Sequence, residues 1–563
     1  MQLSFDATVN LPNGVYDYGT RSSGETHGVV LTKPHVVALI LDLAGYTVDR
    51  DLTSMALLEP ACGHGAFLIP AIERLLEVAR RRGVDIADLH APITACDIDE
   101  EHVARARKAV VTLLEQHGAS RRKAAGIASR WVIQGDFLLK SPARRFDVIV
   151  GNPPYVRIEQ LAPALQAEYR RRYRSLYDRA DLYVAFIEKA LYLLSPSGVL
   201  SFICADRWIV NKYGAPLRRM ITEGFAVSCY VDLHTASPFE SEVIAYPSIF
   251  AIRPGKPGAV RVCSLATASA EECAAIIPAI TEGTSAAAGV GISTYESWFD
   301  GDEPWVISSP THLATLRALE ARFSPIEADG NTRVRIGVAT GDDKTYIVGD
   351  DVDIEPDRLI PLVMRSDIDH GSVRDGRRFV INTFNDDGGV VDLRRYPRLA
   401  RYLAEHEVDI QRRHVAQKNP SSWFRTIDRV YPSLVATPKL LVPDIAGSNE
   451  VVFEEGRFHP HHNLYFVTSN RWDMEVLGGL LSSRVALFFV WSYAVKMRGG
   501  YLRFQAQYLR RIRLPPPDAL PASLAKSIRT AFRRRDFKKL DQLALKAYGL
   551  TDLPPFDFVD TRK

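Results

Sequence analysis

The first 255 residues alternate between apolar runs typical of strands and segments with the period of an amphipathic helix. Helical patterns at 67–82 and 182–194 are among those that separate the apolar runs. Strands that alternate with helices indicate a parallel sheet covered by helices on both faces. The pattern therefore predicts an α/β domain with a Rossmann-like, mostly parallel sheet, whose strands lie within 54–60, 92–98, 146–154, 197–205 and 243–252.

This alternation stops after residue 255. A proline- and glycine-rich run at 253–258 and an alanine-, serine- and glycine-rich run at 285–293 suggest a linker. The pattern beyond them is mixed and broken by prolines, and a helical pattern closes the chain. At 563 residues the chain is also too long for one ordinary domain. We expect a first domain over 1–255, a linker over 256–300, a mixed α+β domain over 301–520 and a C-terminal helical segment over 521–563.

Composition is typical of a globular protein of the cytoplasm. Hydrophobic residues make up 46% of the chain, which is enough for large cores. The six cysteines form no CxxC pair, which argues against a disulfide framework and a zinc site. The N-terminus lacks the basic and apolar regions of a secretion signal. The most apolar late stretch, 476–497, carries Arg484 near its middle, so we expect a buried helix there and no contact with a membrane.

A loop of small residues follows the first predicted strand and opens a helix. Its sequence is EPACGHGAF, from Glu59 to Phe67, with small residues at Ala61, Gly63 and Gly65. Small residues let the backbone approach a ligand closely, and a helix start offers unpaired N–H groups. A dinucleotide would fit such a loop, but the third glycine is absent and Glu59 would repel a pyrophosphate. A cofactor with a cationic amino-acid end suits Glu59 better.

Two further acidic residues follow the next strands. Asp97 ends the second strand, where a carboxylate can bind ribose hydroxyls. Asp136 follows a third strand and precedes Phe137, so an adenine amino group could bind the carboxylate while the adenine ring stacks on the phenyl ring. Each acid alone is more often a helix cap or a solvated loop end. Together, in this order on consecutive strand ends, they favour S-adenosylmethionine as the cofactor.

The run Asn152-Pro153-Pro154-Tyr155 ends the strand at 146–151 and is the most specific motif in the chain. Prolines here would end the strand and rigidify the turn, whatever its function. The flanking residues point to chemistry on an aromatic amino group, whose lone pair is delocalised into its ring. The side-chain oxygen of Asn152 and the carbonyl of Pro153 can each accept one N–H, which localises the lone pair for attack on a methyl sulfonium. Tyr155 supplies a stacking face, and the base has to leave the duplex to reach it.

With these motifs the chain resembles the gamma-class (TaqI-type) DNA adenine-N6 methyltransferases. EPACGHGAFL, ACDID, GDFLL, GNPPY, DLYVAFIEKALYLLSPSGVLSFI and YPSIFAI occur in the order of that family. The resemblance implies that Thr32, in VVLTKPHVVALI, contacts the methionine end of the cofactor. It also implies that Phe239, in HTASPFESEV, places its ring against the flipped base. It extends more loosely through the C-terminal half, where the family carries its target-recognition domain.

The resemblance further implies a site-specific enzyme that transfers methyl groups to double-stranded DNA in a bacterial or archaeal cytoplasm. A separately encoded restriction endonuclease, or other defence proteins, would be its partners. Basic runs with interleaved aromatics at 170–174, 394–402, 411–414 and 501–513 suit a surface that meets phosphates and bases. Arg503, Arg510, Arg511 and Arg513 are candidate phosphate contacts, and solvated helix faces are the alternative.

Other substrates of the same motif remain open. The Asn-Pro-Pro-Tyr turn also serves enzymes that methylate a glutamine amide of release factors or guanine in ribosomal RNA. Those proteins are typically shorter, whereas about 300 residues follow the catalytic domain here. Cytosine-N4 enzymes use a related turn that usually begins with Ser or Asp, so Asn152 favours adenine.

Other classes of protein remain as alternatives. A non-catalytic specificity subunit would need neither the cofactor loop nor the tetrad. A fused nuclease would use acids such as Asp444, Glu454 and Glu455, but the expected lysine is missing from the motif, so we expect solvated loop acids. His459, His461 and His462 lack metal-site spacing, so we expect loop or DNA-facing histidines and no metal.

Overall fold

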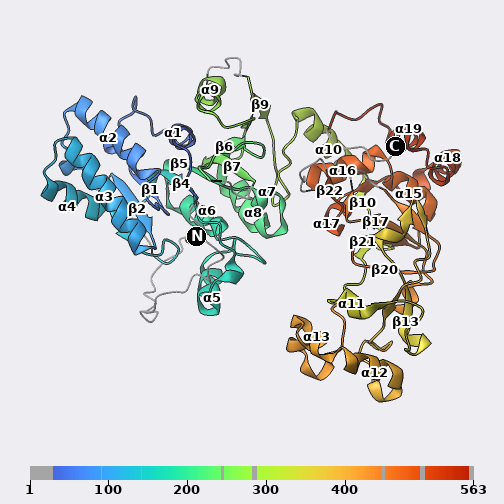
Figure 1. Cartoon of the computed structure of the whole chain (residues 1–563). Helices are drawn as coiled ribbons and strands as arrows, with labels where there is room; N and C mark the ends of the chain where they lie inside the picture. Colours follow the sequence, from blue (N-terminus) through green and yellow to red (C-terminus); the bar gives the residue numbers. More distant parts are fainter. Residues whose placement is uncertain are drawn as a thin grey trace. The chain divides into compact units, whose positions relative to one another are not determined.

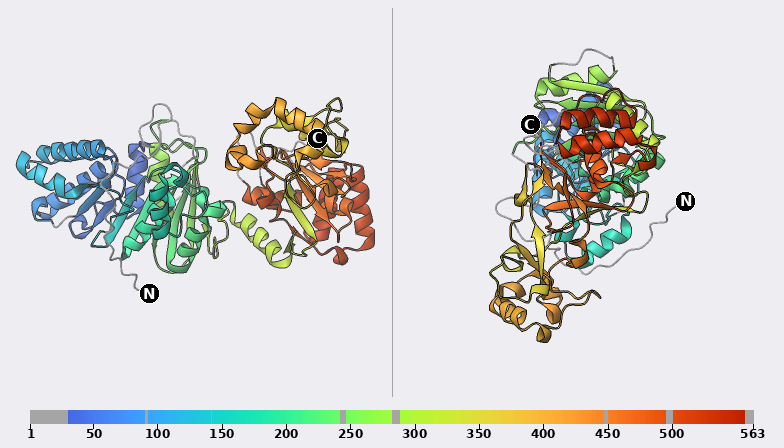
Figure 2. Two further views of the ribbon diagram at one scale, coloured as in Figure 1. Left: turned by 90° about the horizontal axis from the view of Figure 1, so that it is seen from below. Right: turned by 90° about the vertical axis from the view of Figure 1, so that its right-hand side faces the viewer.

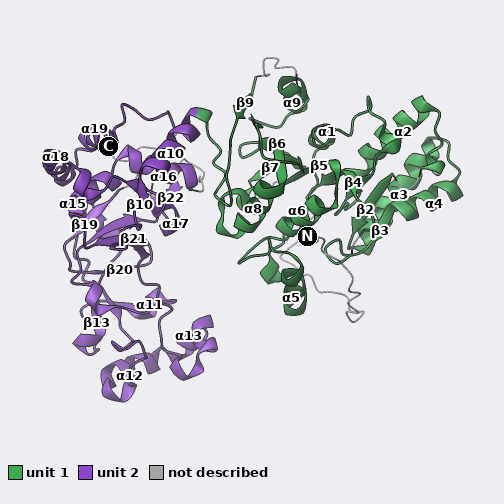
Figure 3. Cartoon of the chain, turned by 180° about the vertical axis from the view of Figure 1, so that it is seen from behind, with its two compact units in different colours: residues 1–310 green, residues 311–563 purple. Residues whose placement is uncertain are grey.

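The structure is a computed structural model that describes residues 30–556 except 90–91, 141, 242–245, 282–287, 447–449 and 495–500. The chain divides into two compact units, Met1–Pro310 and Thr311–Lys563 (Figure 3). Each unit has its own sheets and its own hydrophobic cores.

A nine-stranded sheet runs through the first unit in the order β3-β2-β1-β4-β5-β7-β6-β8-β9 (Figure 1). The first five strands in this order are parallel to one another, whereas β7 lies antiparallel between β5 and β6. This arrangement confirms the predicted α/β fold with a mostly parallel sheet. The strands are β1 (Leu57–Glu59), β2 (Ile93–Asp97), β3 (Val132–Gln134), β4 (Phe146–Gly151), β5 (Leu194–Ala205), β6 (Phe225–Asp232), β7 (Pro247–Pro254), β8 (Val260–Leu265) and β9 (Val290–Tyr295).

Helices cover both faces of this sheet. Figure 1 shows α1 and α9 on one side of the strands and α6 and α8 on the other, and Figure 2 shows the same layers from two further directions. Local signals set several helix ends: the carboxylate of Asp99 accepts two N–H groups at the start of α3, and Gly83 ends α2 at a φ of 67°. The helices are α1 (Pro34–Leu43), α2 (Leu68–Arg82), α3 (Glu100–Gln116), α4 (Arg121–Trp131), α5 (Pro163–Arg172), α6 (Tyr183–Leu193), α7 (Arg207–Val210), α8 (Ala215–Gly224) and α9 (Ala270–Thr281).

The strand order reverses at β1. The chain passes from β1 outward to β2 and β3, and then returns to the other side of β1 as β4. In open α/β sheets, connections on opposite sides of such a point leave a crevice beyond the carboxyl ends of the strands. Glu59 ends β1 and Asn152 directly follows β4, so both lie at this crevice.

Residues 256–300 belong to the first unit, which corrects the predicted linker. β8 pairs in parallel with β6, β9 pairs antiparallel with β8, and α9 contributes Cys273 and Ile276 to the core. The proline- and glycine-rich run at 253–258 covers the end of β7 and most of the turn to β8. Composition of this kind marks a tight connection as well as a linker, which is why the pattern was misleading.

The second unit mixes helices with small sheets, as predicted. Antiparallel strands form a sheet in the order β11-β21-β17-β19, and a second sheet has the order β12-β16-β13-β20. Figure 3 shows α12 and α13 at one end of this unit and α18 and α19 at the other. The strands are β10 (Ser324–Pro325), β11 (Thr332–Ile336), β12 (Ile347–Val348), β13 (Leu359–Val363), β14 (Ile368–Asp369), β15 (Ser372–Val373), β16 (Phe379–Ile381), β17 (Lys439–Pro443), β18 (Ile445–Ala446), β19 (Val452–Glu454), β20 (His459–Pro460), β21 (Leu464–Ser469), β22 (Leu502–Arg503) and β23 (Arg513–Leu514).

Helices pack around these sheets. They are α10 (Pro310–Arg322), α11 (Asp343–Tyr346), α12 (Pro397–Glu405), α13 (Glu407–Gln411), α14 (His414–Lys418), α15 (Met474–Leu481), α16 (Arg484–Tyr493), α17 (Ala506–Leu509), α18 (Ala522–Arg533) and α19 (Phe537–Tyr548). A Cβ on Gly478 of α15 would come within 2.6 Å of the Phe532 ring of α18. The C-terminal helices are therefore part of the core of the second unit, and not the separate segment expected over 521–563.

Up to residue 494, where its described part ends, the apolar stretch forms two buried helices in place of the single predicted one. α15 and α16 are bent by 58° at a short break, where Ser483 caps α16. Most side chains of both helices are buried. Among the described residues, no single helix is long and apolar enough to cross a membrane, and only this bent pair meets the length and composition criteria together.

Glu454 is not a solvated loop acid, as the sequence had suggested. Its side chain is fully buried on β19 and forms an ion pair with the equally buried Lys439 of β17. Glu454 also accepts the N–H groups of Gly456 and Arg457, and Lys439 donates to the carbonyl of Phe458. A buried pair with its remaining hydrogen bonds satisfied is a structural element of the sheet.

Candidate active site

A cavity of about 600 Å³ opens where the strand order reverses. Its walls come from the ends of β1 to β4, from the segment before α1, and from α5 and α6. The residues that the sequence assigned to a site and that line this cavity are Thr32, Glu59, Ala61, Gly63, Asp97, Asp136, Phe137, Asn152 and Pro154. The fold therefore gathers, around one cavity, motifs that are more than 100 residues apart.

The small-residue loop borders the cavity on the side of β1. Gly63 and Gly65 have φ angles of 49° and 96°, which side chains rarely allow. A Cβ on Gly63 would meet no atom within 4 Å, so the loop leaves open space at this point. Asp97 fixes the loop because its Oδ2 accepts the N–H of Gly63 at 2.8 Å.

Glu59 is a buried acid without a full set of partners. Its side chain is 1% exposed, and its Oε2 has no hydrogen-bond partner among the described residues. Burial and the nearby charge of Asp97 hold the pKa of this carboxyl well above its ordinary value. A buried acceptor without a donor is costly, so the site is prepared for a ligand that brings a donor or a positive charge.

Asp136 and Phe137 line the cavity from the end of β3. Asp136 Oδ1 accepts the N–H groups of Leu138 at 2.8 Å and Leu139 at 3.3 Å. Burial raises the pKa of Asp136, and these hydrogen bonds act against that rise. The Phe137 ring lies 5.2 Å from that of Phe186, centroid to centroid, so two neighbouring aromatic rings line the cavity.

Asn152, which also lines the cavity, carries an unpaired acceptor. Its Nδ2 donates to the carbonyl of Val30 at 3.1 Å and lies 3.4 Å from Thr32 Oγ1. These contacts fix the amide, and its Oδ1 is buried without a hydrogen-bond partner among the described residues. The arrangement can hold one N–H of an amino group brought to the end of β4.

Four of the predicted residues do not line the cavity. Gly65 and Pro153 shape the backbone beside it, and the half-buried Tyr155 ring meets Tyr183 edge-on at 6.1 Å. Phe239 is 4% exposed and lies in the core, and its backbone pairs with that of Thr32. The stacking roles of Tyr155 and Phe239 stay predictions.

Sequence comparison identifies the family. The model of the Eco57I restriction-modification methylase family matches residues 93–239. The chain is 44% identical over 538 residues to the type II methyltransferase M.XhoI of Xanthomonas vasicola, covering 94% of this chain and 98% of that protein. It is 45% identical over 540 residues to the type II methyltransferase M.PaeR7I of Pseudomonas aeruginosa, covering 94% and 93%.

The chain belongs to the type II DNA methyltransferases of restriction-modification systems. The fold agrees with this assignment. The type IIL restriction-modification enzyme MmeI in complex with DNA superposes with a TM-score of 0.61 at 13% identity, covering 93% of this chain and 74% of that chain.

As a DNA methyltransferase of this family, the chain uses S-adenosylmethionine as its methyl donor. The cavity fits such a molecule by its donor and acceptor groups. The unpaired Glu59 Oε2 suits the cationic amino-acid end, and the open space beside Gly63 admits a ligand against the backbone. The carboxylates of Asp97 and Asp136 and the ring of Phe137 suit a nucleoside.

The methyltransferase has further cavity residues that sequence reasoning missed. His64, Ile98, His102, Tyr169 and Phe186 also line the cavity. His102 Nδ1 lies 3.2 Å from Asp97 Oδ1, and the ring of His64 meets that of His102 edge-on at 4.9 Å. Phe186 lies on the apolar face of α6, where the helical period signals only burial.

The basic run at 501–513 makes contacts within the second unit of the methyltransferase. Arg503 pairs with Asp444, and Arg510 lies 3.1 Å from Glu327 and donates to the carbonyl of Val334. Arg511 lies over the ring of Tyr493, at 4.8 Å from its centroid. These arginines therefore have structural partners, and contact with phosphates stays a prediction for them and for Arg513.

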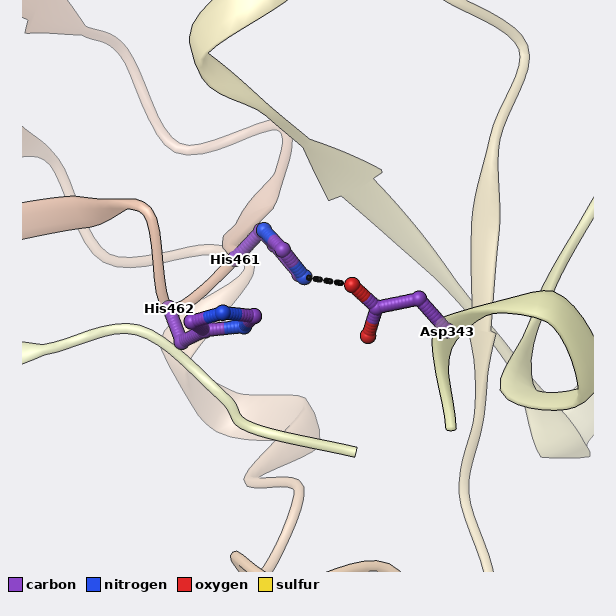
Figure 4. A group of neighbouring side chains, drawn as sticks. All are labelled: Asp343, His461 and His462. Carbon is purple, nitrogen blue, oxygen red and sulfur yellow. Dashed lines mark hydrogen bonds and ion pairs between the residues drawn. The ribbon is translucent and has the colours of Figure 1, made fainter. Parts of the chain in front are cut away.

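A histidine cluster lies in the second unit (Figure 4). His461 Nε2 is 3.1 Å from Asp343 Oδ2, and the rings of His461 and His462 are 4.0 Å apart. The sequence suggested loop or DNA-facing histidines, whereas His459 lies in β20 and both His459 and His461 are buried. One ligand atom from each of Asp343, His461 and His462 lies within 4.8 Å of the others, and the absence of a metal stays a prediction.

Proposed function

We propose that the methyltransferase transfers a methyl group to the exocyclic N6 of an adenine that is flipped out of double-stranded DNA. The observation that carries this proposal is the buried Oδ1 of Asn152, which has no hydrogen-bond partner among the described residues and lies at the carboxyl end of β4. Its amide nitrogen is held by Val30 and Thr32, so the oxygen is the atom left to accept a hydrogen bond. An amino group with two N–H donors is its natural partner.

Catalysis rests on positioning. Asn152 Oδ1 and the carbonyl of Pro153 each accept one N–H of the target amino group, which localises the nitrogen lone pair in line with the methyl group. Bound S-adenosylmethionine supplies an electrophilic methyl carbon. The N–C bond forms as the C–S bond breaks, and the nitrogen then releases one proton to solvent. The rings of Tyr155 and Phe239 hold the extruded base, which is inaccessible inside a stacked duplex.

The remaining cavity residues hold the cofactor. Glu59 and the Thr32 segment take its amino-acid end, and Asp97 takes the ribose hydroxyls. Asp136 accepts the 6-amino group of its adenine, and Phe137 stacks on the ring. Recognition of a DNA sequence falls to the second unit, and a cognate restriction endonuclease shares the same target sequence.

Mapping of modified bases tests the proposal in cells. A host without its own methyltransferases expresses either the wild-type chain or the Asn152→Ala variant, and its genome is sequenced by a method that detects modified bases. We expect N6-methyladenine at one defined sequence in the first host and none in the second. Methylation of cytosine, or equal signals in both hosts, would contradict the proposal.

The affinity for S-adenosylmethionine should fall as the pH is lowered. Burial and the charge of Asp97 raise the pKa of Glu59 well above that of an ordinary glutamate. The carboxyl is therefore protonated and neutral at pH values where an ordinary glutamate is charged. The cofactor ammonium needs the carboxylate. Binding is therefore full above the raised pKa and weakens up to about tenfold per pH unit below it. Calorimetric titrations between pH 8 and pH 5 measure the trend.

Glu59→Gln is the matched control for this pH dependence. The variant keeps the shape but is neutral at every pH. We expect it to bind about tenfold or more weakly at pH 8, because a hydrogen bond to a charged group contributes roughly 1.5–3 kcal/mol. The affinity of this variant for S-adenosylmethionine should change less with pH than that of the wild type. The difference isolates the contribution of Glu59 to the pH dependence from any contribution of His64 and His102, which line the same cavity. Identical slopes in both proteins would show that Glu59 does not face the ammonium.

A further inference from the structure

Three side chains of the segment after the catalytic motif hold the loop that carries Asp136. Tyr169 on α5 donates its hydroxyl to Asp136 Oδ2 at 2.5 Å. Arg172 donates to the carbonyl of Leu139 at 2.9 Å, and the hydroxyl of Tyr173 donates to the carbonyl of Leu138 at 2.5 Å. The loop at 135–140 is thus tied to α5 by one contact to a side chain and two to its backbone.

Helix α6 holds the same loop from another direction. Lys189 donates to the carbonyls of Phe137 and Lys140, and its Nζ lies 4.7 Å from the centroid of the Phe137 ring. The backbone of the loop is therefore fixed without Tyr169. What Tyr169 adds is a hydrogen bond to the one carboxylate in the loop.

The acceptor positions of Asp136 show the purpose of this bond. A carboxylate has about four acceptor positions, two on each oxygen. Leu138 and Leu139 occupy those of Oδ1, and Tyr169 occupies one on Oδ2. One position on Oδ2 is left, and both Asp136 and Tyr169 line the cavity. Tyr169 itself is 1% exposed, so its hydroxyl is set by packing and cannot turn to solvent.

We propose that Tyr169 is a positioning residue for the nucleobase of the cofactor. Its hydroxyl occupies one lone pair of Asp136 Oδ2 and fixes the carboxylate, so that the remaining lone pair faces the 6-amino group of the cofactor adenine. This inference rests on the proposed role of Asp136 toward that amino group. It makes α5, which follows the catalytic motif in the chain, part of the machinery that selects adenine over other purines.

Paired ligands test this role in the full-length protein. S-adenosylhomocysteine and its 6-deamino analogue, in which hydrogen replaces the amino group, are titrated by calorimetry. We expect Tyr169→Phe to lower the affinity for S-adenosylhomocysteine about five- to tenfold, as befits the weakening of one charge-assisted hydrogen bond. The affinity for the 6-deamino analogue should stay within about twofold, because that ligand makes no bond to Asp136.

Tyr173→Phe is the matched control on the same segment. It removes a hydroxyl from a backbone carbonyl of the same loop and leaves Asp136 untouched. We expect it to lower the melting temperature without changing the ratio of the two affinities. If Tyr169→Phe weakened both ligands equally, as a loosened loop would, Tyr169 would be a structural residue and the proposal would be wrong.

Asp136→Asn separates this inference from the proposed function beneath it. The N–H groups of Leu138 and Leu139 hold the amide oxygen of this variant at the position of Oδ1, so its amide nitrogen takes the position of Oδ2. This nitrogen cannot accept a hydrogen bond from the 6-amino group, so the preference for S-adenosylhomocysteine over the analogue should disappear. A loss of preference in Asp136→Asn but not in Tyr169→Phe would overturn the role of Tyr169 alone. An unchanged preference in Asp136→Asn would instead overturn the role of Asp136, and the inference with it.

Discussion

Asn152→Ala should reduce methyl transfer by about 100-fold or more, because loss of one preorganised hydrogen-bonding group at a reaction centre typically costs that much. The variant removes the unpaired Oδ1 that accepts an N–H of the target amino group. It leaves Glu59, Asp97 and Asp136 in place, so the affinity for S-adenosylmethionine should change little. Turnover is measured with labelled cofactor on unmethylated DNA, and cofactor affinity is measured by calorimetry.

Thr32→Val is the control for this variant. Asn152→Ala also breaks the bonds from Nδ2 to Val30 and Thr32, and these bonds orient the amide. Thr32→Val weakens that orientation but keeps the acceptor oxygen. Because the Thr32 segment is also assigned to the cofactor, turnover is compared at saturating S-adenosylmethionine, where we expect less than about a tenfold loss, in line with one neutral hydrogen bond. Near wild-type turnover of a folded Asn152→Ala protein would rule out the acceptor role of the side chain.

A chain that ends at Pro310 should bind S-adenosylmethionine but lose site-selective methylation. It keeps all nine strands of the first sheet and every residue that lines the cavity. It lacks the unit to which we assign sequence recognition, and specific binding to DNA is typically about 10³–10⁷ times tighter than non-specific binding. At low concentrations of DNA, methylation should therefore fall at least about 1,000-fold. Modified-base sequencing of treated plasmid measures both rate and selectivity.

A second truncation checks the domain boundary itself. A chain that ends near residue 258 lacks β8 and β9 and exposes the edge of β6, which pairs with β8 over Cys229–Asp232. It also leaves the apolar side of α1 without α9, with which α1 packs. We expect this shorter chain to aggregate.

If the chain ending at Pro310 still methylated one defined sequence, recognition would have to lie in the first unit.

The sequence predicted the parts of the site that follow strand ends. Four residues of the site lie at the last position of a strand or within two residues after it: Glu59, Asp97, Asp136 and Asn152. The carboxyl ends of parallel strands lie at one edge of the sheet, so these residues come together there. Their order along the chain was enough to indicate a cofactor and an amino-group acceptor. Tyr169 and Phe186 could not be found in this way, because they reach the cavity from helices whose period indicates only a buried face.

Long-range pairing explains the errors elsewhere. The run at 253–258 has the composition of a linker, and only the pairing of the following strand, β8, with β6 shows that the sheet continues beyond it. The sequence around Glu454 indicates a solvated acid. The pairing of β19 with β17 places Lys439 next to it and buries both side chains. In both places the residues nearby in sequence are ordinary, and the tertiary partner decides the structure.

The identity of the methylated base tests most directly whether the chain methylates the N6 of adenine. Purified wild-type protein is incubated with labelled S-adenosylmethionine and unmethylated genomic DNA, and the DNA is digested to nucleosides and analysed by liquid chromatography and mass spectrometry. We expect the label in N6-methyldeoxyadenosine, and we expect Asn152→Ala to lower it by about 100-fold or more. Label in N4-methyldeoxycytidine or 5-methyldeoxycytidine would contradict the assignment of Asn152 to an adenine amino group.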